Sequence, residues 1–125
     1  MTSQLARQLA WSNRLTPGLI FLKSSVNGSN LRLLSILKSR SCTAGELIEV
    51  GIECIEFQRE LKLELEAFEF WIKENAELVK VWEGETSLGV YESVSWRIIK
   101  NTRDRARQLV DQNLQIFDEL HGVKI

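Results

Sequence analysis

The side chains that could do chemistry in this 125-residue chain are few and poorly placed for catalysis. His121 is the only histidine, and it lies near the end of the sequence. Cys42 and Cys54 lack the close spacing and the histidine partners of a metal site. The sequence contains no glycine-rich phosphate loop. We therefore expect no catalytic residue, no metal site and no cofactor, and we expect that the protein is not an enzyme.

Carboxylates are the most regular chemical feature of the chain. Spacing of three or four residues puts six of them on one side of a helix: Glu46, Glu49, Glu53, Glu56, Glu60 and Glu64. On an open helix face, such groups lack the burial that would make one of them a general acid. The pattern predicts a solvent-exposed face, a docking face for a basic partner, or a face covered by basic segments of the same chain.

A basic face in the C-terminal third is the candidate nucleic-acid contact. It consists of four residues at helical spacing: Arg97, Lys100, Arg103 and Arg107. Asp104 and Asp111 lie close to them, and the net charge of the whole chain is −1. A solvated helix face is the simpler interpretation. Binding of nucleic acid, as a small helical subunit of a larger complex, is kept as the second functional hypothesis.

The charges are unevenly distributed along the chain. Residues 1–45 contain six basic and no acidic residues, whereas residues 46–85 contain twelve acidic and four basic ones. The basic, serine-containing N-terminal segment has the composition of a mitochondrial transit peptide, so an imported mitochondrial component is a third hypothesis. Otherwise the segment packs on the rest of the chain. Two cysteines without metal spacing favour a reducing compartment, and we expect the cytoplasm.

The carboxylates belong to a long amphipathic helix expected over residues 43–80. Thr43 and Glu46 have the spacing of a capping box at its start. At 1.5 Å per residue such a helix would span about 57 Å, which exceeds the diameter of a compact domain of this size. We therefore expect the helix to project, to bend or to be broken. Gly45 and Gly51 are its weak points.

A second long helix is expected over residues 87–120, capped by Thr86 or Ser87 and ended near Gly122. The short connection makes the two helices antiparallel neighbours. The apolar side chains expected to pack between them are Leu61, Leu65, Phe68, Ile72, Val94, Ile98, Ala106 and Leu109.

The N-terminal part predicts shorter elements. Residues 3–14 form an amphipathic pattern that ends at Pro17, residues 24–30 read as a polar loop, and Asn30 can cap a short helix through residue 37. Residues 19–37 are expected to cover three isoleucines on the long helix, Ile48, Ile52 and Ile55. The predicted fold is all-α and a single domain, residues 1–125. It consists of a basic segment (1–42) with one or two short helices and a long antiparallel hairpin (43–120), together a three- or four-helix bundle.

Trp71, Trp82 and Trp96 fall towards the closed end of this hairpin. They either fill the core or form a contact surface for a partner. No apolar run approaches the ~20 residues that span a bilayer. The functional prediction is a non-enzymatic protein–protein interaction or assembly subunit, with a protein partner or a homodimer contact at the tryptophans. No membrane span and no small-molecule substrate are expected.

Overall fold

The structure, a computed structural model, describes the backbone of residues 16–84 and 90–125 and the side chains of residues 16–84 and 96–125. The regular elements of this part are α2 (Thr16–Ser39), α3 (Ala44–Glu74), α4 (Ala76–Glu83), α5 (Val90–Asp118) and a 3₁₀ turn, η1 (Glu119–Gly122). The predicted all-α fold is confirmed. The pattern in residues 3–14 and the caps proposed at Thr86 and Ser87 lie outside the described residues.

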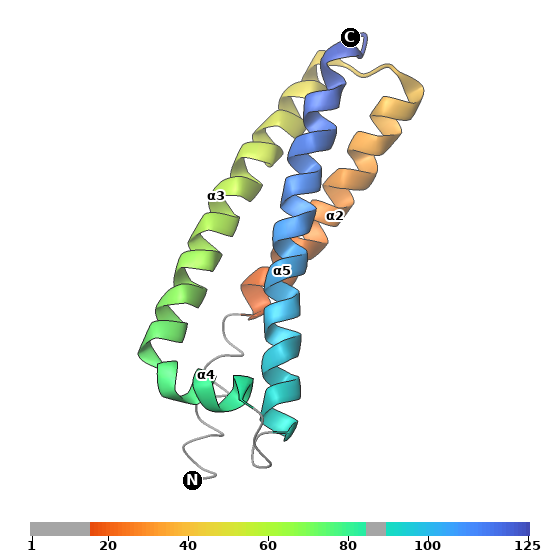
Figure 1. Ribbon diagram of the computed structural model, residues 1–125. Helices are drawn as coiled ribbons and strands as arrows, with labels where there is room; N and C mark the ends of the chain where they lie inside the picture. Colours follow the sequence, from red (N-terminus) through yellow and green to blue (C-terminus); the bar gives the residue numbers. More distant parts are fainter. Residues whose placement is uncertain (1–15, 85–89) are drawn as a thin grey trace.

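The helices form a bundle in which α2 and α5 run in the same direction and α3 runs against both (Figure 1). The short helix α4 turns sideways from the end of α3 towards α5. Helix α5 packs against α2, α3 and α4, and most extensively against α2. The expected antiparallel pair of α3 and α5 is therefore present, and α2 packs beside it in the part of the bundle away from α4 (Figure 1).

Helix α2 corrects the expectation of a loop at residues 24–30 and of short N-terminal helices. It is one helix of 24 residues. Its buried residues recur every three or four positions, and two of them are polar: Leu19, Leu22, Val26, Ser29, Asn30, Leu33 and Ile36. Asn30 is thus a core residue in mid-helix and not a cap. Residues 24–30 suggested a loop because they are rich in serine and asparagine. In the structure Ser29 and Asn30 belong to the buried stripe of a helix.

Helix α3 begins as predicted and ends earlier than predicted. The Thr43 hydroxyl accepts from the Glu46 amide, and the Glu46 carboxylate accepts from the Thr43 amide, both at 3.0 Å. The break comes at Asn75 and not at the glycines. The Asn75 side-chain amide donates to the Trp71 carbonyl at 2.9 Å, and such local bonds compete with the helical ladder.

The turn at Asn75 brings Trp82 back onto Trp71. In a straight helix, eleven residues would separate the two along the axis by about 16 Å. Their ring centroids are instead 5.9 Å apart and the rings are stacked. The segment predicted as one long helix is therefore divided into α3 and α4, and α4 closes one end of the bundle.

On α5 the prediction is correct at Ala106 and Leu109, which are buried, and wrong at Ile98, which is 60% exposed. Its neighbour Ile99 is buried instead, and the side chain of Val94 lies outside the described residues. One residue corresponds to a rotation of about 100° around a helix, so Ile98 faces away from α3. Among its expected neighbours Leu61 and Phe68 are buried, and Leu65 and Ile72 are packed at the edge of the core.

Two apolar clusters make up the core, and a polar group lies between them. One cluster contains the tryptophans and continues to Val26 on α2, and the other begins at Leu33. Between these positions the Asn113 side-chain amide donates to the Asn30 side-chain oxygen at 2.8 Å and to the Ser29 hydroxyl at 3.2 Å. The Asn30 side-chain amide donates to the Leu109 carbonyl at 3.2 Å. These bonds satisfy both side-chain amide groups and the Asn30 oxygen, whereas the buried Asn113 side-chain oxygen has no partner within the described residues.

The C-terminal residues hold the connection between α2 and α3. Arg40 ends α2 with a φ of 57°, the left-handed conformation common after a helix. The Cys42 amide then donates to the Lys124 carbonyl at 3.1 Å, and the Lys124 amide donates to the Arg40 carbonyl at 3.4 Å. Figure 1 shows the C-terminus beside this connection. The segment after η1 therefore closes the end of the bundle opposite α4.

Two phenylalanines on α3 test the position of the core. Phe68 is fully buried and stacks on Trp96, whereas Phe70 is 60% exposed. We expect Phe68→Ala to lower the free energy of unfolding by ~3–5 kcal/mol, the range for large-to-small core changes. Phe70→Ala is the matched control and should cost less than about 0.5 kcal/mol. Denaturant unfolding measures both, and equal costs would contradict the assignment of the two faces.

Two asparagines on α2 test the polar group in the core. Asn30→Ala removes the partners of the Leu109 carbonyl and the Asn113 amide, and we expect it to cost ~1–3 kcal/mol of unfolding free energy. Asn27 lies one turn earlier and is exposed. Asn27→Ala should therefore be neutral or slightly stabilising, because alanine is the better helix former. If thermal unfolding ranked the two variants in the opposite order, the buried network would have no energetic role.

Candidate functional site

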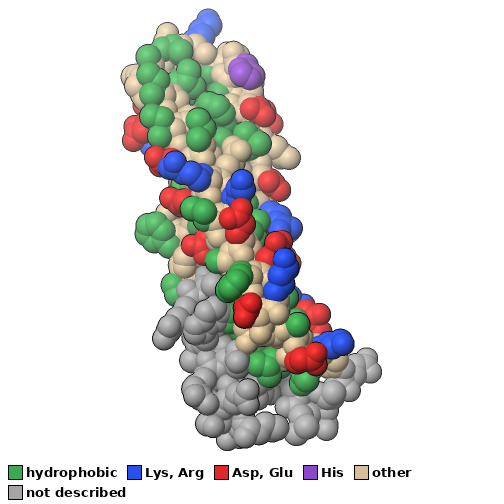
Figure 2. Space-filling view, turned by 90° about the vertical axis from the view of Figure 1, so that its left-hand side faces the viewer, with side chains coloured by type: hydrophobic (Ala, Val, Ile, Leu, Met, Phe, Trp, Pro, Cys, Tyr) green, Lys and Arg blue, Asp and Glu red, His purple; other side chains and the backbone are tan. Residues whose placement is uncertain are grey.

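The outer face of α3 carries three isoleucines that remain accessible to solvent. Ile48, Ile52 and Ile55 are 63%, 51% and 69% exposed, and their spacing of four and three residues forms one ridge. Figure 2 shows hydrophobic side chains gathered over the upper part of this side of the molecule, where the N-terminal half of α3 lies. The expectation that residues 19–37 cover them is wrong, because one apolar side of α2 is buried in the core and its other apolar side chains, Leu31 and Leu34 among them, are themselves exposed.

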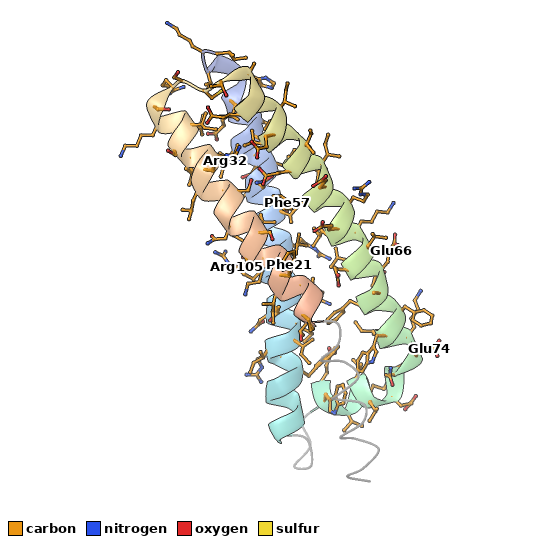
Figure 3. The ribbon with its side chains drawn as sticks, turned by 180° about the vertical axis from the view of Figure 1, so that it is seen from behind. Phe21, Arg32, Phe57, Glu66, Glu74 and Arg105 are labelled. Carbon is orange, nitrogen blue, oxygen red and sulfur yellow. The ribbon has the colours of Figure 1, made fainter. Side chains whose placement is uncertain are left out.

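Carboxylates border this ridge on the side of α2. Arg32 of α2 reaches across to α3 and pairs with Glu49 at 2.8 Å and with Glu53 at 3.3 Å (Figure 3). The hydrogen bond that the Arg32 guanidinium donates to Glu49 raises the pKa of Arg32 and keeps it charged. Glu56 and Glu60 continue the same row and form no ion pair with the part of the chain that the structure describes. One edge of the ridge is therefore negatively charged.

A pocket of about 240 Å³ lies between α2 and α3. Its lining combines apolar side chains with two carboxylates: Gly18, Phe21, Leu22, Glu60, Leu63 and Glu64. The Glu64 carboxylate lies against Gly18, at a place that any Cβ on Gly18 would occupy. Burial raises the pKa of Glu64, and the charge of Glu60 raises it further. The pocket thus holds a partly desolvated negative charge beside apolar walls.

The three tryptophans predicted as a partner contact lie inside the bundle. Trp71, Trp82 and Trp96 are at most 3% exposed. Trp96 is at the centre, with ring centroids 5.7 Å from Trp71 and 5.6 Å from Trp82. Contacts of this kind contribute about 0.5–1.5 kcal/mol each beyond burial. The rings therefore join α3, α4 and α5 to one another and offer no surface to a partner in this conformation.

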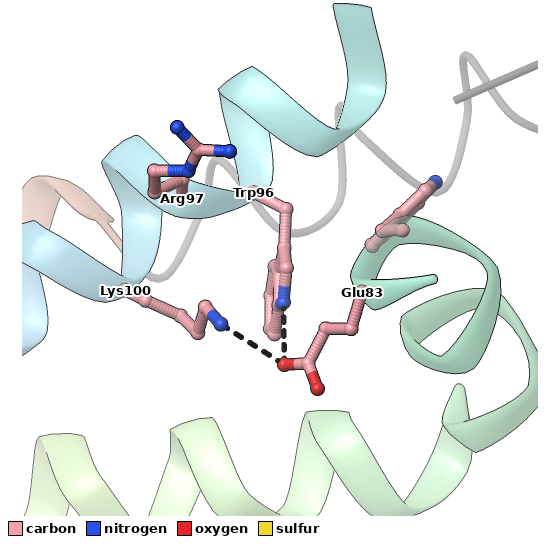
Figure 4. A pocket seen from close by; sticks show the side chains of 5 residues that line it. Glu83, Trp96, Arg97 and Lys100 are labelled. Atoms are coloured by element: carbon pink, nitrogen blue, oxygen red, sulfur yellow. Dashed lines mark hydrogen bonds and ion pairs between the residues drawn. The ribbon is translucent and has the colours of Figure 1, made fainter. Parts of the chain in front are cut away.

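Beside the tryptophans, Glu83 forms a small polar group with α5 (Figure 4). One oxygen of its carboxylate accepts from the Trp96 indole N–H and from the Lys100 ammonium, both at 3.0 Å. The hydrogen bond from Trp96, followed by that from Lys100, lowers the pKa of Glu83. A pocket of about 290 Å³ opens here, lined by Trp82, Glu83, Trp96, Arg97 and Lys100. Three of the lining side chains, Glu83, Trp96 and Lys100, are already bonded to one another, which suits a structural role.

The basic face predicted on α5 is only partly available. Lys100 is engaged with Glu83 and lies 5.9 Å from the Trp96 ring centroid. Arg103 lies over Phe68 at 4.9 Å and pairs with Asp104 at 3.0 Å. Arg97 and Arg107 are exposed. Two of the four cations therefore cover the aromatic core, and the structure does not bring all four together as a free patch.

The remaining sequence candidates are dispersed in the fold. Cys42 and Cys54 are buried free thiols, and burial raises the pKa of Cys54. Over residues 16–84 and 90–125, no three of the His, Cys, Asp and Glu side chains gather in an arrangement that could hold a metal. In the same part of the chain, none of the helices combines the length and apolar character needed to cross a bilayer.

Comparison with known proteins returned no match to a family model, to a curated protein or to a solved structure. The role of the α3 surface therefore has to be inferred from its own side chains.

The surface that sequence reasoning missed is the ridge on α3 together with the pocket beside Phe21. The signal was present, because Ile48, Ile52 and Ile55 recur at helical spacing on a different side of α3 from Val50 and Phe57. Two apolar stripes on one helix offer two surfaces for packing, and the chain itself buries the one that contains Val50 and Phe57.

The pH dependence of stability tests the Glu83 group. Its hydrogen bonds favour the carboxylate in the folded state. The stabilisation is therefore complete above the ordinary carboxyl pKa and is lost as the pH falls through the lowered pKa of the folded state. Glu83→Gln should lower the free energy of unfolding at neutral pH by less than about 1 kcal/mol, since the carboxylate is partly exposed. The difference should vanish in acid.

Denaturant unfolding over a pH series measures this difference. Glu77→Gln on the same helix is the control, because Glu77 is exposed, and it should change the free energy of unfolding by less than about 0.5 kcal/mol. A Glu83→Gln difference that stayed constant from neutral to acid pH would show that the charge of Glu83 is not involved.

Proposed function

We propose that the protein is a non-enzymatic interaction or assembly subunit that binds a protein partner through the outer face of α3. The observation that carries the proposal is the exposure of Ile48, Ile52 and Ile55 on a single ridge. Isolated apolar residues on a surface need no explanation, whereas a contiguous row of them marks a contact surface. The proposal assigns no reaction to the chain.

The use of α3 by the fold supports this proposal. The opposite side of the helix is already committed to the core through Val50, Phe57 and Phe68. A surface helix needs only one apolar side to pack on its own domain. A second apolar side therefore serves an additional contact. The burial of the tryptophans moves the proposed contact from the closed end of the bundle to this face.

The two buried thiols suit a compartment in which cysteines stay reduced, and we place the protein in the cytoplasm on this ground. The mitochondrial alternative differs in one observable. Import with cleavage would remove the basic N-terminal residues, so the mass of the chain purified from its native source decides between the two.

Site-specific photocrosslinking tests the proposed function. A photoreactive amino acid at Ile52 should give discrete higher-mass adducts when the chain is expressed in its native cells, because position 52 lies in the proposed contact. The same amino acid at Ile98, which is 60% exposed on α5, is the matched control and should give none. The adducts are read by denaturing gel electrophoresis and mass spectrometry. Absence of a specific adduct at position 52 would refute the proposal.

A further inference from the structure

We infer that the partner of the α3 face is a basic amphipathic helix, whose apolar side packs on the isoleucine ridge and one of whose cationic side chains enters the pocket beside Phe21. This inference rests on the proposed function and specifies its partner. We call the ridge and the pocket together the acceptor surface: Ile48, Ile52, Ile55, Phe21, Glu60 and Glu64.

The shape of the acceptor surface suits a helix. Ile48, Ile52 and Ile55 form a row, and Leu63, also 60% exposed, lies further along the same side of α3 at the pocket, with the exposed Arg59 between Ile55 and Leu63. The sixteen residues from Ile48 to Leu63 extend over about 22 Å of the helix axis. That length matches about four turns of a second helix, whose apolar residues at every third or fourth position would lie along the row.

The charge around the ridge defines the partner further. Helix α3 carries nine acidic and three basic residues. Arg32 neutralises part of this charge at Glu49 and Glu53, whereas Glu56 and Glu60 have no ion pair within the described residues. A partner with lysine or arginine beside its apolar row would be attracted to this edge.

The pocket adds a position for one particular side chain. Its walls, Phe21, Leu22 and Leu63, are apolar, and the carboxylates of Glu60 and Glu64 lie beside them. Lysine and arginine carry an apolar stem and a charged head, so the stem would cover the walls and the head would reach the carboxylates. A cation there would also stabilise the charge of Glu64, which burial now disfavours.

The same charges argue against other occupants. A second copy of this chain would bring one α3 with its excess of carboxylates against another, and like charges repel. Phosphates of nucleic acids or of an anionic membrane would meet the same negative edge. A basic helix is the occupant that satisfies the apolar row and the carboxylates together.

Two designed peptides test the inference on the full chain. One is a helix of about five turns with leucine at every third or fourth position and lysine or arginine on both flanks. The other has glutamate at each cationic position. Fluorescence anisotropy of the labelled peptides should show binding of the basic peptide with a Kd near ~10⁻⁶ M, weakened by salt, and no binding of the acidic one.

Variants locate the binding on the acceptor surface. The double change Ile52→Ser and Ile55→Ser should weaken binding of the basic peptide by roughly 10–100-fold, because two apolar contacts are lost. The double change Glu60→Gln and Glu64→Gln should weaken it by about 3–10-fold and reduce its salt dependence. Ile98→Ser is the matched control and should leave the Kd unchanged. Circular dichroism checks that each variant keeps its helix content.

Several outcomes would overturn the inference. They are failure of the basic peptide to bind, equal binding of both peptides, and binding unaffected by the isoleucine changes. Sedimentation showing a dimer of the chain alone that Ile52→Ser and Ile55→Ser dissociate would identify a second copy as the occupant. If that dimer is found, or if crosslinks at Ile52 map to an acidic or non-helical segment of a partner, the proposed function stands and only the basic helix is refuted. Absence of any crosslink at Ile52 refutes the function itself.

Discussion

The hydrogen-bonded group of Ser29, Asn30 and Asn113 is the constraint on which the bundle depends. An apolar core alone would allow α2 to shift by a turn along α5 at small cost, because leucines and valines replace one another well. A buried N–H group without a partner costs about 1–3 kcal/mol, and the arrangement that joins Asn30 to Asn113 gives the side-chain N–H groups of both residues an acceptor. With that arrangement fixed, the tryptophans meet at one end and the Lys124 backbone meets the connection after Arg40 at the other.

The parts of the fold that could be predicted from the sequence are those set by local chemistry. The capping box at Thr43 forms as its spacing requires, and the helical periodicity after it is real. The break at Asn75 could not be placed, because the local bond from the Asn75 side chain acts together with the stacking of Trp82 on Trp71, and the sequence pattern continues as helical across it. The polar stretch of α2 was misjudged for a related reason. A buried Asn30 resembles a loop residue until its partner on α5 is known.

In the candidate site, too, the sequence predicted the features set by local spacing and did not predict those that depend on contacts between helices. Sequence reasoning identified the row of carboxylates and left open whether it faces solvent, a partner or the chain itself. The structure shows the first and the third of these conditions on one row, because Arg32 of the same chain covers Glu49 and Glu53, while Glu56 is exposed to solvent and unpaired within the described residues. The tryptophans lie near one end of the bundle, as predicted. Whether their rings face the core or the solvent depended on the turn that brings α4 back against α3. Aromatic residues serve cores and interfaces equally well, so composition could not separate the two roles.

The position of α5 has a consequence for synthesis of the chain. This helix packs against every other helix of the described bundle, yet it is the last of them to leave the ribosome. Until α5 has emerged, the apolar sides of α2 and α3 can pack only on each other. The Asn30 side-chain oxygen also lacks the hydrogen bond that the Asn113 amide donates to it in the bundle. Domains generally fold as units once their elements are available. The nascent chain therefore exposes the apolar sides of α2 and α3 until α5 emerges, so factors that shield emerging chains meet α2 and α3 before the native bundle exists.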